Sequence, residues 1–94
     1  MNSNLPAKVE EKHIHNALGA YVRYLRKAQR PKEWGQKYLA QRAGVSQGVV
    51  SRIEDGSSVR LNTYIRLAHA FGITYVDLFR RAVKYSKRKE TKRC

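Results

Sequence analysis

The sequence has few of the residues that enzymes and metal sites need. Its 94 residues contain one cysteine, three histidines and seven carboxylates. No spacing among them predicts a set of metal ligands or a nucleophile beside its base. His13 and His15 diverge on a helix, so we expect exposed bystanders rather than a metal site. Because a glycine-rich phosphate loop is also missing, we expect no catalysis, no cofactor and no small-molecule ligand.

The single cysteine, Cys94, is the last residue, so an intrachain disulfide is excluded. The sequence contains no apolar run long enough to span a bilayer, and its N-terminus does not resemble a signal peptide. These features predict a cytoplasmic protein without a membrane partner.

Positive charge is what the sequence has in excess. The net charge is +13, and 41% of the residues are hydrophobic. Residues 80–94 hold eight Lys or Arg against one Glu, and residues 16–79 hold ten against four acidic residues. A soluble surface would not require the folded part to be basic as well. The charge therefore points to nucleic acid or to an anionic surface as the partner.

Residues 36–55, QKYLAQRAGVSQGVVSRIED, read as two short helices joined by a tight turn. Small and apolar residues recur at helical spacing in both halves of this stretch. Gly44 stands where a left-handed C-terminal cap needs a residue without a Cβ, and Ser46 stands where an N-cap is needed. Val50 and Ile53 turn inward. The pattern predicts a helix-turn-helix.

Further residues along the chain extend this pattern beyond the motif. They are Leu18-Gly19, Val22-Arg23, Leu25-Arg26, Trp34-Gly35-Gln36, Ile53-Glu54-Asp55-Gly56, Leu67-Ala68, Phe71-Gly72-Ile73 and Asp77-Leu78-Phe79. Together they resemble the lambda-repressor/Cro family of DNA-binding domains over roughly the middle two thirds of the chain. The resemblance implies an all-α domain of five helices that binds double-stranded DNA and regulates transcription.

We expect an N-terminal arm over residues 1–12, the DNA-binding domain over 13–85 and a basic tail over 86–94. The tail is rich in charge and poor in apolar residues, which predicts disorder in isolation. The first helix is expected from about Lys12 to near Arg30, because Pro31 disfavours helical geometry in the residue before it.

The segment from Gln29 to Trp34 is longer than the corresponding turn of the family. Trp34 precedes the second helix, where it is expected to pack on Leu39 as an aromatic at the edge of the core rather than as a partner-binding residue. Ser58 is a candidate cap for the fourth helix. Thr74 to Asp77 resembles a capping box at the start of the fifth.

The third helix is expected to lie in the major groove. Gln47 can pair with adenine through two hydrogen bonds, and Arg52 can pair with guanine in the same way. Ser51 can donate to or accept from several bases, and Gly48 allows the backbone to approach DNA closely. These four residues form the predicted base-contacting set.

The start of the second helix is expected to face a phosphate, because its dipole and free N–H groups favour an anion. Gln36 would donate a hydrogen bond from its side chain there. Further candidates are cationic or hydroxyl side chains that position a protein without reading sequence. The predicted phosphate-contacting set is Gln36, Lys37, Arg42, Ser46 and Arg60.

Glu54 ends the recognition helix, where a carboxylate would face phosphates unless a cation neutralises it. The family resemblance implies that Arg26 is this partner, and Arg23 is the alternative. A planar guanidinium can bind both oxygens of the carboxylate. We therefore expect a partly buried Arg26–Glu54 salt bridge.

The resemblance further implies a homodimer on a palindromic operator, with its interface on the fifth helix or around Ile14. Repression by occluding polymerase is expected, since 94 residues leave no room for a ligand-sensing or large activation domain. This would be a nucleoid-associated protein of the bacterial or phage type. An antitoxin-like or coactivator-like interaction module and a binder of structured RNA remain alternatives. The polar outer face of the third helix, with Gln47, Ser51 and Arg52, favours DNA.

Overall fold

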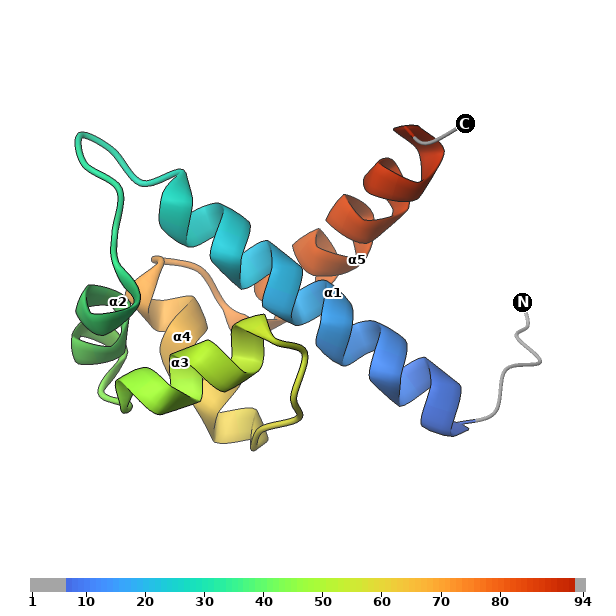
Figure 1. Cartoon of the computed structure of the whole chain (residues 1–94), viewed down its shortest axis with the longest axis horizontal. Coiled ribbons are helices and arrows are strands. Elements are labelled where there is room, and N and C mark those ends of the chain that lie inside the picture. The colour runs from blue at the N-terminus through green and yellow to red at the C-terminus, as the bar shows by residue number, and fades with distance from the viewer. Residues whose placement is uncertain (1–6, 93–94) are drawn as a thin grey trace.

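The computed structural model describes residues 7–92, with side chains described as far as Arg88. This part of the chain forms five helices and no strand (Figure 1). The helices are α1 (Ala7–Lys27), α2 (Gln36–Ala43), α3 (Gln47–Glu54), α4 (Leu61–Ala70) and α5 (Tyr75–Lys92). The expected all-α, five-helix class is confirmed. None of these helices has the length and apolar content needed to cross a bilayer.

Helix α1 runs through the middle of the molecule and packs against both α3 and α5 (Figure 1). Helix α2 packs against α3 and α4, and α4 also contacts α5. One large side chain or more from every helix is fully buried at the centre: Leu18, Val22, Leu39, Val50, Ile53, Leu67 and Leu78. This shared core fixes how α3 is rotated, and so decides which of its side chains face solvent.

The bounds of α1 differ from the predicted ones at both ends. The helix begins at Ala7, so residues 7–12 of the expected arm are helical, while residues 1–6 lie outside the described part. It ends at Lys27, three residues earlier than predicted. The guanidinium of Arg30 donates to the carbonyl oxygens of Lys27 (3.4 Å) and Gln29 (2.9 Å), and thereby satisfies acceptors that a longer helix would have used.

The basic tail also differs from its prediction. Helix α5 continues to Lys92, so residues 86–92, which were expected to be disordered, are helical. Lys, Arg and Glu are good helix formers, and they extend a helix whose first half is already held by packing. Arg93 and Cys94 lie outside the described residues.

Three of the predicted caps were right and one was wrong. Gly44 has φ 74°, and the Ser46 side chain accepts from the Val49 N–H at 3.2 Å. Thr74 Oγ1 accepts from the Asp77 N–H at 3.1 Å, and the Asp77 carboxylate pairs with Arg80. Ser58 does not cap α4. That helix begins at Leu61 without a side-chain cap, so Ser58 stands two residues before its N-cap position.

Candidate nucleic-acid interface

The outer face of α3 presents the four residues expected to contact bases. Val50 and Ile53 are fully buried, and this orientation leaves Gln47, Gly48 and Arg52 exposed and Ser51 half-buried. Among the described residues, neither the Gln47 amide nor the Arg52 guanidinium has a hydrogen-bond or ion-pair partner. Both side chains are therefore available to an external ligand with donor and acceptor groups.

Gly48 is not required by the packing of α3. A Cβ added there would lie 3.9 Å from Arg52 Nη1 and from Ser46 Oγ, which is ordinary van der Waals contact. Glycine inside a helix costs roughly 0.5–1 kcal/mol relative to alanine. The helix therefore carries a destabilising residue at a position where a ligand can approach the backbone closely.

Arg26 and Glu54 are brought together below the end of α3. Arg26 Nε lies 2.7 Å from Glu54 Oε2, and Nη2 lies 2.9 Å from Oε1. The two side chains are 10% and 5% exposed. Arg26 Nη1 also donates to the carbonyl oxygen of Trp34 at 2.9 Å. The pair thus ties α1, the end of α3 and the residue that precedes α2 into one unit, whereas Arg23 is exposed.

Gln36 contributes to the same cluster. Its Nε2 donates to Glu54 Oε1 at 3.0 Å, so one of the two amide N–H groups is already bonded inside the protein. The second can still donate to a ligand in front of α2. Sequence reasoning placed Gln36 at the right helix end but missed this bond, which depends on a contact 18 residues away in the chain.

The other phosphate candidates have different surroundings. Lys37 and Arg60 are exposed, and Ser46 accepts a bond from the Val49 N–H while keeping its own hydroxyl hydrogen to donate. The Arg42 guanidinium lies 4.8 Å from the centre of the Trp34 ring, and its Nε donates to the Ala70 carbonyl oxygen at 3.4 Å. Arg42 would therefore have to bind a phosphate while it keeps its contacts with Trp34 and Ala70.

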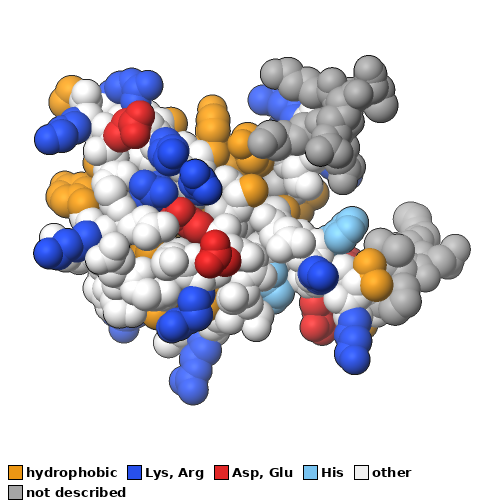
Figure 2. Space-filling model, viewed as in Figure 1, with side chains coloured by type: hydrophobic (Ala, Val, Ile, Leu, Met, Phe, Trp, Pro, Cys, Tyr) orange, Lys and Arg blue, Asp and Glu red, His pale blue; other side chains and the backbone are white. Residues whose placement is uncertain are grey.

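Trp34 closes the long loop before α2. Its ring is half-buried and stacks on Phe71, with centroids 5.6 Å apart and planes 8° apart. It meets Tyr38 edge-on at 5.2 Å. These contacts agree with an aromatic at the edge of the core. They fix the end of the loop in front of α2. Figure 2 shows Lys and Arg side chains spread over α1, this loop and α3.

His15 is not the exposed bystander that its spacing from His13 suggested. Its Nδ1 lies 2.8 Å from the hydroxyl oxygen of Tyr64, which is almost fully buried on α4. Burial raises the pKa of the Tyr64 phenol. The available signal was the helical spacing of His15 with Leu18 and Val22, which turn into the core. No group of His, Cys, Asp and Glu in residues 7–92 is arranged to hold a metal ion.

Comparisons with known proteins agree with this geometry. A family model described as helix-turn-helix matches residues 22–78. The crystal structure of the clp gene regulator ClgR from Corynebacterium glutamicum is similar, with a TM-score of 0.69 and 26% sequence identity. The similarity covers 85% of this chain and 83% of that one. No curated protein matches the sequence.

Proposed function

The chain belongs to the helix-turn-helix family of the lambda-repressor/Cro type and is a DNA-binding regulator of transcription, and we propose that it represses by binding one operator sequence as a homodimer. The observation that carries the proposal is the outer face of α3. It presents an amide and a guanidinium without partners in the described chain, on a helix fixed by a buried ion pair. A protein seated in the major groove of a promoter would exclude polymerase from that site.

In this proposal α3 lies in the major groove, with Gln47 on adenine and Arg52 on guanine. Ser51 adds a short hydroxyl, and Gly48 lets the backbone approach the base edges. The start of α2 meets the flanking phosphate through Gln36, with Lys37, Ser46, Arg42 and Arg60 as further phosphate contacts.

We expect Gln47→Ala and Arg52→Ala each to lose about 1–3 kcal/mol of binding to the preferred site, because each removes a bidentate base contact. Selection from a random duplex library supplies that site, and titration at fixed salt measures the affinity. Binding to an unrelated duplex should hardly change. Lys8→Ala, which removes an exposed charge on α1, is the control. Equal weakening on every duplex would show that these two residues do not read bases.

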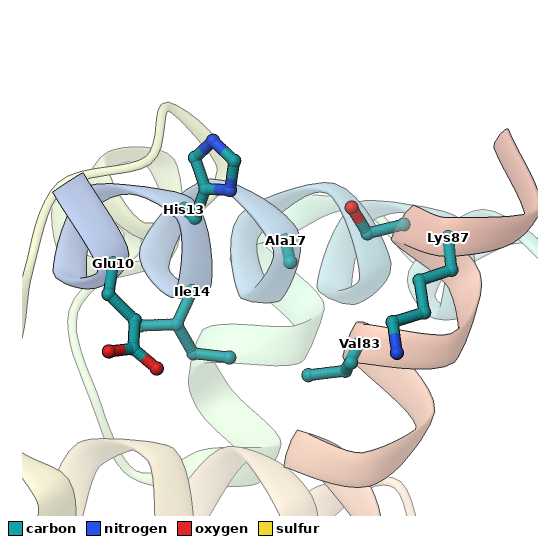
Figure 3. Close-up of a pocket in the computed structure, with 7 residues that line it drawn as sticks. Glu10, His13, Ile14, Ala17, Val83 and Lys87 are labelled. Atoms are coloured by element: carbon teal, nitrogen blue, oxygen red, sulfur yellow. The ribbon is translucent and has the colours of Figure 1, made fainter. Parts of the chain in front are cut away.

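The homodimer is proposed to form where α5 meets the N-terminal half of α1. A groove of about 290 Å³ opens there, and Ile14, Ala17 and Val83 supply apolar side chains to it (Figure 3). Glu10 stands on the α1 wall and Lys87 on the α5 wall. A two-fold copy would pack the apolar side chains that line this groove against those of the other protomer. The recognition helices would need a separation of about 34–36 Å.

Val83→Glu is expected to convert this dimer into a monomer, because it places a carboxylate inside the apolar part of the groove. Val83 is 38% exposed, so the folded protomer tolerates the change. Light scattering, free and with a full operator, measures the mass. The matched control is Leu61→Glu, which alters an exposed apolar residue on α4. A wild-type protein that is monomeric in both conditions would contradict the dimer.

A further inference from the structure

A second groove lies between the C-terminal half of α1 and α5, with a volume of about 650 Å³. None of the residues proposed to contact bases or phosphates lines it. We propose that this groove binds an acidic, amphipathic segment of another protein. The proposal does not depend on repression or on the dimer, because the groove uses different residues from both.

The first reason is uncompensated positive charge. Arg23, Lys27 and Arg30 line the groove, and no carboxylate does. Arg23 and Lys27 are exposed, and neither belongs to an ion pair among the described residues. They stand four residues apart on one helix, and like charges at that spacing weaken a helix. An acidic ligand would turn this local repulsion into attraction.

Positive charge also flanks the groove on α5. Tyr85 is the α5 residue that lines the groove. Arg81 and Arg88 are exposed one turn before and one turn after it on the same helix. Arg30 is also held in place, since its guanidinium bonds the carbonyl oxygens of Lys27 and Gln29. A cation fixed before binding loses less conformational entropy when it meets a carboxylate.

The second reason is the apolar lining between these charges. Ala20 and Ala28 offer small methyl groups, and Tyr24 is 50% exposed. The Tyr24 ring packs on Tyr21 at 5.8 Å and on Tyr85 at 5.0 Å. The Tyr21 and Tyr85 rings pack against the Tyr24 ring and leave half of its surface exposed, so it is a poor platform for stacking bases. A leucine or phenylalanine side chain can instead rest on the tyrosine edges and the alanines, with carboxylates reaching the flanking cations.

Because the groove and the DNA-contacting face use different residues, the groove could bind such a segment while α3 lies in the major groove of DNA. The DNA-bound protein would then recruit an acidic partner through this groove. Repression by occluding polymerase requires no such contact.

The test uses the full chain and a labelled peptide of about 15 residues, long enough to form a helix, with Glu on one face and Leu and Phe on the other. Two further peptides carry Gln for every Glu, or Ser for every Leu and Phe. Fluorescence anisotropy measures affinity, and amide chemical shifts map the site. We expect the acidic amphipathic peptide to bind most tightly, with shifts at Ala20, Tyr24 and Tyr85 rather than at Gln47 and Arg52.

Arg23→Glu with Lys27→Glu should weaken this binding by about tenfold or more. Lys8→Glu with Lys12→Glu is the matched control, since it reverses two exposed charges at the same spacing on the same helix and should change affinity little. Tyr24→Ser should weaken binding without altering charge. Equal losses in the two double variants, shifts centred on α3, or tighter binding of a single-stranded DNA of the same length in this groove would each overturn the proposal.

Discussion

Replacing Glu54 with alanine is expected to lower the free energy of unfolding by about 3–5 kcal/mol, because it leaves the Arg26 charge buried without its counter-ion. Arg26 is almost fully enclosed, and two of its nitrogens bond the two carboxylate oxygens at 2.7 and 2.9 Å. The Gln36 amide would lose its acceptor in the same change. Urea unfolding followed by circular dichroism measures the loss.

The neighbouring carboxylate supplies the control. Asp55 is exposed and one residue further along, so Asp55→Ala removes the same charge without opening a buried contact and should change stability by less than about 0.5 kcal/mol. The double replacement Arg26→Met and Glu54→Leu should recover much of the loss, since two apolar side chains leave no unpaired charge. A single Glu54→Ala variant as stable as Asp55→Ala would contradict the structural role of the pair.

The helix-turn-helix could be predicted from local sequence because its signals are local. Gly44 must adopt φ 74°, Ser46 must bond an N–H three residues away, and both requirements restrict the residue type at that position. The inward turn of Val50 and Ile53 follows from helical spacing alone. These residues lie within a few positions of the groups they contact, so the sequence carries the information directly.

Features that depend on distant contacts were harder to predict. The His15–Tyr64 hydrogen bond joins residues 49 apart in the chain, and the expected role of His15 was wrong for that reason. Ser58 was chosen as a cap by residue type, but the loop places α4 two residues later. The partners of Gln36 and Arg42 were likewise set by packing between helices. The base contacts remain predictions, since they depend on a ligand as well as on the fold.

The close approach of α1 to the end of α3 could not be predicted from the spacing of apolar residues along the helices. Gly19 is buried on α1, and a Cβ built there would lie 2.1 Å from the carbonyl oxygen of Ile53 and 3.1 Å from its carbonyl carbon. The obstacle is backbone, which cannot rotate aside as a side chain can. The two helices can therefore approach this closely only where α1 carries a glycine.

Gly19→Ala is accordingly expected to lower the free energy of unfolding by about 3 kcal/mol, at the upper end of the range for overpacking. The change should also move the end of α3 away from α1, weakening the Arg26–Glu54 pair and binding to the preferred DNA site. Gly48→Ala is the matched control. It makes the same substitution inside a helix where the Cβ has room, and should stabilise the protein by up to about 1 kcal/mol. Urea unfolding of both variants measures the difference. If both changed stability in the same direction, the glycine at position 19 would not be setting the distance between α1 and the recognition helix.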